Sequence, residues 1–208
     1  RSSDLLGCHP RRTCGPLSRL EAIHAGHPME FDQKMSGILY GVGLGPGDPD
    51  LITVKSSRLI SQARVIAYPS LAGGESFARS IAADLISPDA EEIVMDVPMT
   101  VERAPAQAAY DIGAKNIAAV LDRGEDVVCL CEGDPFFYGS FMYLYARLVA
   151  DYQVEVVPGV TSITTCAARA GMPLAARNER LTVLPGPLPA EELRARIEGA
   201  ESVAIMKV

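Results

Sequence analysis

The sequence predicts an α/β protein built on a mainly parallel sheet. Short apolar runs alternate along the chain with longer helical stretches, which is typical of βα units. Two of the apolar runs end in Gly-Asp-Pro, at residues 47–49 and 133–135. Glycine permits positive φ and close approach to the main chain, while proline fixes φ and removes a donor. We therefore expect two sharp strand-to-loop junctions that form one ligand site between two strand ends.

The first half of the chain supplies six of the expected elements. Asp50 is expected to cap the first helix, because its carboxylate can accept a free helix N–H. The longest helix is rich in alanine, and only Gly113 in its interior opposes helix formation. In chain order we expect a strand at 38–42, a helix at 51–61, a strand at 64–68, a helix at 75–85, a strand at 92–95 and a helix at 104–121.

The second half continues the alternation and then changes character. The apolar run at 126–131 indicates a strand buried on both faces. Residues 171–179 have turn residues and no clear period, so we expect a domain boundary there. The expected elements are a strand at 126–131, a helix at 140–149, a strand at 153–157 and a helix at 160–170, followed by a strand at 181–184, a helix at 189–197 and a strand at 202–206.

Three segments follow from this pattern. Residues 1–34 start with Arg1, hold all three histidines and include Cys8 and Cys14. We expect a non-native or disordered extension ahead of Met35; the spacing of its Cys and His residues matches no standard zinc pattern, so no metal is expected. Residues 35–172 are expected to form an N-terminal α/β domain. Residues 173–208 are expected to start a second, incomplete α/β domain, because one βαβ unit cannot close a core.

Composition narrows the class of protein. The chain has 208 residues, 48% of them hydrophobic, and a formal charge of −7, which argues against a nucleic-acid-binding surface. No apolar run reaches the roughly 18 residues of a membrane span, so we expect a soluble, cytoplasmic protein without a membrane partner. Cys129, Cys131 and Cys166 are expected to be buried, reduced thiols. Because no histidine follows residue 34, histidine triads and histidine-ligated metals are excluded from the main body.

The glycine-rich loops by themselves leave several interpretations open. GVGLGPG at 41–47 superficially resembles a dinucleotide-binding fingerprint, but Pro46 stands where the helix should begin. The chain also has no Gly-Lys-Ser/Thr phosphate loop. Taken alone, the loops indicate that a small molecule approaches the main chain, and tight turns without a ligand are the alternative.

Three longer segments resemble a known family. GLGPGDPDLIT at 43–53, EGDPFFYGSF at 132–141 and VPGVTSITTCAARAGMPLA at 157–175 are similar to the signature segments of the tetrapyrrole (corrin and porphyrin) methylases. The resemblance runs from about Leu39 to Val208. It implies a fold of two α/β domains with S-adenosylmethionine in the cleft between them, the second domain being truncated here. It also implies a small-molecule tetrapyrrole substrate, no metal, and a homodimer when the protein is full length.

Other segments favour one subgroup of the family, the enzymes that methylate carbon 20 of precorrin-2 in cobalamin biosynthesis. These segments are VIAYPS at 65–70, VPMT at 97–100, FMYLYARL at 141–148, ERLTVLP at 179–185 and the closing VAIMKV. Another methylase of the same fold, such as a uroporphyrinogen III methylase, is the first alternative. A non-catalytic nucleotide or tetrapyrrole carrier and a nicotinamide dehydrogenase are further alternatives. Whether the substrate is metal-free or carries cobalt stays open.

The resemblance also implies which residues contact the methyl donor: Pro46, Glu132, Gly133, Asp134, Phe137, Thr161, Ser162 and Met206. Asp134 could accept hydrogen bonds from ligand hydroxyls or amine, and the Thr/Ser pair offers hydroxyls. No catalytic base is assigned, Tyr138 and Glu132 being the open candidates. Because the substrate carries many carboxylates, we hypothesise a basic lining drawn from Lys55, Arg79, Arg103, Arg147, Arg169, Arg177 and Arg180.

Overall fold

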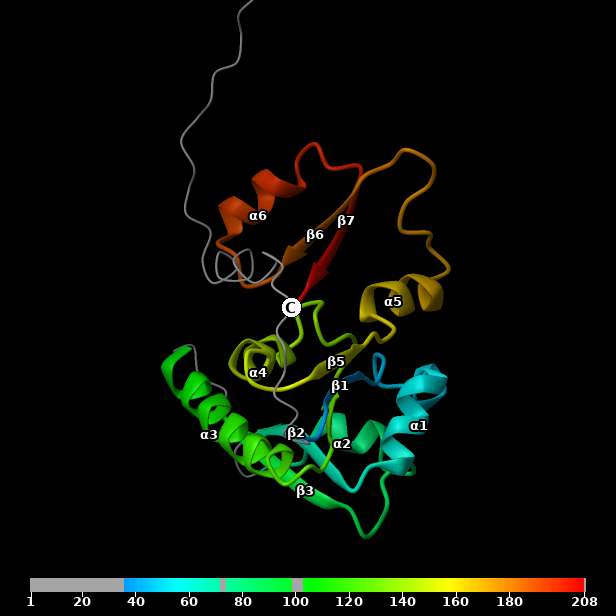
Figure 1. The fold of residues 1–208 in the computed structure, drawn as a ribbon. Coiled ribbons are helices and arrows are strands. Elements are labelled where there is room, and N and C mark those ends of the chain that lie inside the picture. The colour runs from blue at the N-terminus through cyan, green and yellow to red at the C-terminus, as the bar shows by residue number, and fades with distance from the viewer. Residues whose placement is uncertain (1–35, 72–73, 99–102, 208) are drawn as a thin grey trace, which may run out of the picture. The chain divides into compact units, whose positions relative to one another are not determined.

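The computed structural model describes residues 36–71, 74–98 and 103–207, so the expectations for residues 1–34 lie outside the described residues. Its main sheet has five parallel strands in the order β3-β2-β4-β1-β5 (Figure 1). The predicted α/β alternation is thereby confirmed. The strands are β1 (Leu39–Gly43), β2 (Val65–Leu71), β3 (Glu91–Val97), β4 (Val127–Cys131) and β5 (Val154–Val157). The accompanying helices are α1 (Val54–Gln62), α2 (Phe77–Ile81), α3 (Arg103–Leu121), α4 (Phe141–Leu148) and α5 (Ser162–Ala170).

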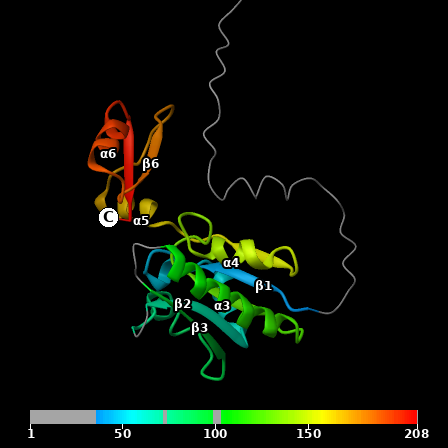
Figure 2. The same cartoon turned by 90° about the vertical axis from the view of Figure 1, so that its left-hand side faces the viewer.

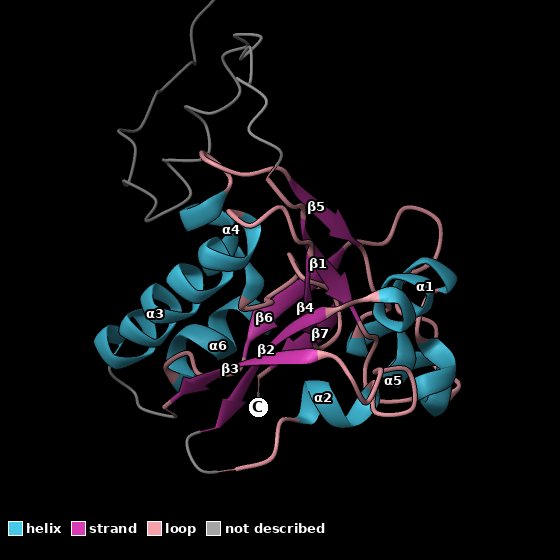
Figure 3. Ribbon diagram, turned by 60° about the horizontal axis from the view of Figure 1, so that its bottom comes forward, coloured by secondary structure: helices cyan, strands magenta, loops and turns pink. Residues whose placement is uncertain are grey.

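Helices cover both faces of the sheet (Figure 3). On one face α3 and α4 lie side by side, as Figure 2 also shows, and their buried residues Ile117 and Phe141 pack with Leu39 of β1. On the other face Ile60 of α1 and Leu130 of β4 belong to a second apolar cluster. Every residue of β4 is buried, as the continuous apolar run predicts for a strand covered on both sides.

The glycine inside the long helix has a packing reason. A Cβ atom at Gly113 of α3 would lie 2.5 Å from the sulfur of Met95 in β3. Glycine weakens a helix by about 1 kcal/mol relative to alanine. The close approach of Met95 explains why glycine occupies this position, and α3 continues through it as predicted.

The structure corrects two expected helices. Asp50 does not cap α1, because Pro49–Leu51 form a separate 3₁₀ turn and Thr53 Oγ1 accepts from the N–H of Ser56 at 3.1 Å instead. The helix expected at 75–85 is shorter, since α2 ends at Ile81. Beyond it the backbone N–H groups bond mainly three residues back, from Leu85 to Ala82 for example, which is turn geometry.

The expectation for the cysteines is confirmed in two cases and wrong in the third. Cys129 and Cys131 are buried free thiols, whereas Cys166 is exposed. The two buried cysteines lie in β4, which has helices on both sides. Cys166 instead lies in α5, where Ile163 is the one buried residue among 162–170.

A second, smaller sheet follows at the end of the chain. Its strands β6 (Leu181–Pro185) and β7 (Ser202–Met206) are parallel and are joined by α6 (Ala190–Ile197). Ser202 Oγ donates to the carbonyl of Leu174, which ties β7 to the connecting segment. The division of the chain at residue 172 into two domains remains a proposal. Within the described ranges, no helix combines the length and the apolarity that crossing a bilayer requires.

Candidate functional site

Three loops meet where β4, β1 and β5 end. These strands are neighbours in the sheet and run parallel, so their carboxyl ends lie at one edge. The two Gly-Asp-Pro loops touch directly, because Gly45 and Gly133 form an isolated antiparallel bridge with N···O distances of 3.3 and 2.8 Å. The prediction that both junctions converge on one place is confirmed. Open α/β sheets bind ligands outside the carboxyl ends of their strands.

Glycines let the three backbones approach closely. A Cβ atom at Gly159, which follows β5, would lie 2.0 Å from the carbonyl oxygen of Gly133 and 2.9 Å from Cα of Gly43. A Cβ atom at Gly43 would lie 2.5 Å from the amide nitrogen of Gly159. Because the atoms that such a Cβ would meet belong to the backbone, no side-chain rotation could relieve these contacts. Two of the glycines thus serve packing between loops rather than the approach of a ligand.

Gly133 differs from its two partners in this junction. Its φ is +63°, a left-handed conformation that favours glycine, and a Cβ atom there would have no neighbour within 4 Å. The space beside Gly133 is therefore open, and this is where a ligand can reach the main chain.

Asp134 joins two of the loops through its carboxylate. Oδ1 accepts from the backbone N–H groups of Phe136 and Phe137 at 2.9 and 3.0 Å, and Oδ2 accepts from the N–H of Gly159 at 3.0 Å. A carboxylate has about four acceptor positions, so these bonds occupy most of them. Asp134 therefore organises the loops, and the hydrogen bond to a ligand that the sequence suggested stays a prediction.

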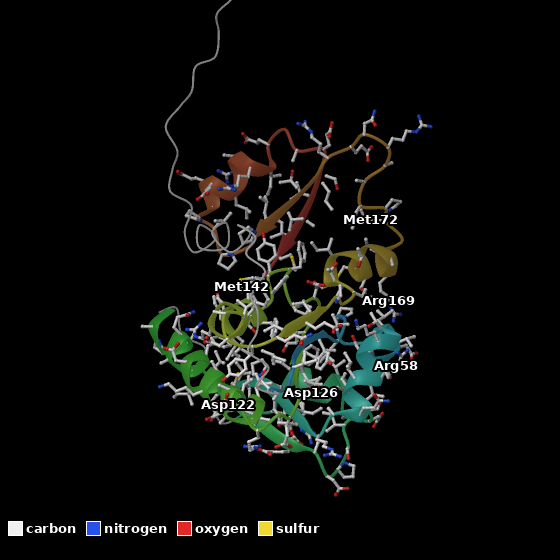
Figure 4. The ribbon with its side chains drawn as sticks, viewed as in Figure 1. Arg58, Asp122, Asp126, Met142, Arg169 and Met172 are labelled. Carbon is white, nitrogen blue, oxygen red and sulfur yellow. The ribbon has the colours of Figure 1, made fainter. Side chains whose placement is uncertain are left out.

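The first loop is fixed from two further directions. The buried hydroxyl of Ser56 in α1 donates to the carbonyl of Gly43 at 2.9 Å. Asp48 accepts from Arg169 of α5 at 3.1 Å, and Figure 4 labels this arginine on its helix. That ion pair is exposed at Arg169, so its contribution to stability is small, on the order of 0–1 kcal/mol. The buried hydroxyl of Ser56 is the firmer of the two attachments.

A cavity of about 430 Å³ lies at this junction. That volume is within the range of small-molecule sites, which is about 300–1,000 Å³. All eight residues that the sequence assigned to the donor site line it: Pro46, Glu132, Gly133, Asp134, Phe137, Thr161, Ser162 and Met206. The structure thus brings together residues from the loops after β1, β4 and β5 and from the end of β7.

Another cavity, of about 400 Å³, is found at the opposite edge of the sheet. Residues at the amino ends of the strands line it, including Tyr40, Arg64 and Asp126. None of the eight predicted residues is among them, and Asp126 already accepts from the N–H of Ile38 at 2.7 Å. The chemistry of the loops therefore points to the cavity at the carboxyl edge.

Three charged side chains line that cavity: Glu132, Asp134 and Lys207. Desolvation raises the pKa of Glu132, although the side chain still reaches solvent in the cleft, and the positive charge of Lys207 opposes this rise. Burial also raises the pKa of Cys131 well above its usual range, so this thiol stays protonated in the cavity wall.

The structure does not place the expected basic side chains around the cavity. None of the seven Lys or Arg candidates lines the cavity. Five of them pair with acidic side chains of the chain itself, as Lys55–Glu155, Arg79–Glu92, Arg147–Asp111, Arg169–Asp48 and Arg180–Glu201. Arg177 is exposed, and the side chain of Arg103 lies outside the described residues.

Sequence reasoning missed several residues that line the cavity. Lys207 is the basic one, and its φ of 57° is unusual for a residue with a side chain. Pro69 and Phe77 reach the cavity from β2 and the start of α2, outside the three signature segments. Lys207 and Pro69 lie in the closing VAIMKV and in VIAYPS, which favoured the subgroup, but no local pattern marks Phe77.

The comparison with protein families agrees with this architecture. Residues 38–208 match the family model described as Tetrapyrrole (Corrin/Porphyrin) Methylases. The chain belongs to this family.

Individual relatives show which kinds of tetrapyrrole methylase the chain is similar to. A precorrin-2 C(20)-methyltransferase from Sinorhizobium sp is 41% identical over 84% of this chain and 76% of its own length. The cobalamin biosynthesis protein CobIJ from Mycobacterium bovis is 42% identical over 83% of this chain but only 35% of its own length. The crystal structure of a uroporphyrin-III C-methyltransferase from Thermus thermophilus, complexed with S-adenosylhomocysteine, is 30% identical with a TM-score of 0.53. That match covers 74% of this chain and 57% of the solved one.

Proposed function

We propose that the protein transfers a methyl group from S-adenosylmethionine to carbon 20 of precorrin-2, or of its cobalt-bearing counterpart, in cobalamin biosynthesis. The observation that carries the proposal is the convergence of three signature loops on one cavity that all eight predicted contacts line. Family membership and 41% identity to a precorrin-2 C(20)-methyltransferase support the choice of substrate.

The lining of the cavity fits an adenosyl sulfonium. Phe77, Phe137 and Pro46 offer apolar surface for an adenine ring, and the hydroxyls of Thr161 and Ser162 can bond polar groups of the ribose or amino acid. The open space beside Gly133 admits the ligand to the main chain. Thr161 is the N-cap of α5, but its side chain makes no capping bond to the helix backbone. Its hydroxyl pairs with that of Thr164 at 3.3 Å and keeps further hydrogen-bonding capacity for this role.

Catalysis by this site depends on alignment. When bound, S-adenosylmethionine supplies an activated methyl group on a positively charged sulfur. The glycine junction and the Asp134 carboxylate hold the loop backbones in fixed positions, so the cavity presents one orientation to its ligands. Phe77 and Phe137 add apolar surface to the wall of the cavity. Such positioning can supply on the order of 7–11 kcal/mol of rate enhancement.

The test is a methylation assay with labelled S-adenosylmethionine. Precorrin-2, cobalt-precorrin-2 and uroporphyrinogen III are offered separately under anaerobic conditions, and the products are identified by mass and NMR. We expect a single added methyl at carbon 20 of one of the first two. Methylation of uroporphyrinogen III alone would identify the protein as a different methylase of the same fold. Binding of S-adenosylhomocysteine without transfer to any of the three would point to a non-catalytic binding protein.

The second candidate function is another methylation step of cobalamin biosynthesis. CobIJ is 42% identical, slightly more than the carbon-20 enzyme from Sinorhizobium sp, and the name of CobIJ does not specify one reaction. The position of the new methyl group in the product separates the two possibilities.

A further inference from the structure

The proposed reaction releases a proton for which the site must have an acceptor. Carbon 20 carries one hydrogen before methylation. Once the methyl group has been added, the C–H bond breaks, its electron pair returns to the conjugated ring and the proton leaves. This inference rests on the proposed function, and it concerns which side chain of the cavity takes that proton.

Most polar groups of the cavity are poor acceptors. Tyr138, Ser140, Thr161 and Ser162 line it with hydroxyl groups, which accept a proton only weakly. The ammonium group of Lys207 has no free lone pair.

The other two ionisable side chains of the cavity wall, Cys131 and Asp134, are also unsuited to accept the proton. The buried thiol of Cys131 stays protonated, because burial raises its pKa. The Asp134 carboxylate already accepts three backbone N–H groups, and protonation would weaken the bonds that join two loops. Elimination thus leaves Glu132 as the only lining carboxylate whose lone pairs are free.

The position of Glu132 agrees with this role. It directly follows β4, whose odd-numbered residues Cys129 and Cys131 belong to the apolar cluster formed with α3 and α4. Side chains alternate along a strand, and Leu130 accordingly belongs to the cluster on the opposite face. Among the described residues, no hydrogen bond or ion pair involves the Glu132 carboxylate, although it lines the cavity.

We infer that Glu132 is the catalytic base that removes the proton from the methylated meso carbon. Its carboxylate accepts the proton while the C–H electron pair restores the conjugation of the ring, and the resulting carboxylic acid then loses the proton to solvent in the cleft. No oxidant, metal or further reactant is needed for this step.

The surroundings of Glu132 act on its basicity in two directions. Desolvation raises its pKa, which makes the carboxylate a stronger base. The positive charge of Lys207 opposes this rise. The other titratable groups that line the cavity are Cys131, Asp134 and Tyr138.

Hydrogen exchange tests the inference independently of methyl transfer. With S-adenosylhomocysteine in place of the methyl donor, a protonated Glu132 can deliver a deuteron from D₂O to carbon 20 and then remove the original proton. We expect the wild-type protein to accelerate loss of the carbon-20 proton signal of the bound tetrapyrrole. Glu132→Gln should lower both this exchange and methyl transfer by about 100-fold or more. Its affinity for S-adenosylhomocysteine, measured by calorimetry, should stay within about threefold of wild type.

Two variants accompany this measurement. Glu132→Asp retains a carboxylate and should recover part of the exchange, which a purely structural role would not predict. Glu91→Gln removes an exposed carboxylate outside the cavity and should behave as wild type. Melting temperatures of all variants check that each one folds.

Separate outcomes overturn the inference and the proposed function. If Glu132→Gln exchanges and methylates at wild-type rates, Glu132 is not the base, and the proposed function stands. If it loses affinity for S-adenosylhomocysteine in parallel with activity, Glu132 holds the donor and the inference is again wrong. If the wild-type protein methylates no tetrapyrrole, the proposed function fails and the inference fails with it.

Discussion

The glycine junction allows a quantitative prediction for the substitution Gly159→Ala. The new Cβ atom would lie 2.0 Å from the carbonyl oxygen of Gly133, whereas ordinary contacts begin at 3.4 Å. Relieving such overpacking costs about 1–3 kcal/mol. The shift would also break the 3.0 Å bond from the Gly159 N–H to the Asp134 carboxylate, a bond to a charged group that contributes about 1.5–3 kcal/mol.

Together these effects should lower the free energy of unfolding by about 2.5–6 kcal/mol. At about 2–4 °C per kcal/mol for a chain of this size, the melting temperature should fall by roughly 5–24 °C. Because the displaced loops line the cavity, affinity for S-adenosylhomocysteine should also fall, by at least about tenfold. Thermal unfolding and calorimetry on the same preparations measure both quantities.

Gly171→Ala is the matched control. Gly171 has a φ of +64° and open space around it, so alanine there should lower the free energy of unfolding only by the strain of the left-handed backbone, about 1–2 kcal/mol. It is not among the residues that line the cavity, so ligand affinity should not change. The reasoning is refuted if Gly159→Ala destabilises the protein no more than Gly171→Ala and binds S-adenosylhomocysteine as wild type does.

Three further predictions concern charge and space. Lys207→Met removes the charge that lowers the pKa of Glu132, so the acid limb of the pH–rate profile should move to higher pH; an unmoved limb would show that Lys207 does not act on the base. Hydrogen bonds from Arg79 lower the pKa of Glu92 from 4.5 to about 2, so the stabilisation they give is present above pH 4.5 and is lost as the pH falls toward 2. Acid unfolding of Glu92→Gln, followed by circular dichroism, should lack that component, and a curve parallel to wild type would contradict the assignment. Gly133→Ala should cost about 1–2 kcal/mol of stability and weaken S-adenosylhomocysteine binding measured by calorimetry, whereas unchanged affinity would place the ligand elsewhere.

Local sequence patterns were sufficient for the order of the elements. The continuous apolar run of β4 and the alanine-rich stretch of α3 each favour one kind of element, and the structure has both where they were expected. Helix ends were harder to predict, because Asp50 and Thr53 are both good caps and the choice between them depended on the 3₁₀ turn at Pro49–Leu51. Capping preference alone does not distinguish two acceptable residues three positions apart.

The candidate site was predictable in its members but less so in their roles. Seven of the eight expected residues line one cavity because the loops after parallel neighbouring strands share an edge, and Met206 joins them from the end of β7 in the second sheet. The sequence did not show that the Asp134 carboxylate accepts a hydrogen bond from the backbone N–H of Gly159, 25 residues away. Nor could the sequence show that five of the proposed basic residues already have acidic partners.

The sequence by itself determined the α/β alternation and the two Gly-Asp-Pro bends, because periodicity, glycine and proline act on the backbone over a few residues. Only the tertiary structure decided that Gly43 and Gly159 are needed for packing, that the Glu132 carboxylate lacks a partner within residues 36–71, 74–98 and 103–207, and that Lys207 reaches the same cavity. Those properties depend on which strands become neighbours, and a pairing such as β1 with β4 joins residues 88 positions apart. Interactions at such separations leave no local periodicity in the chain.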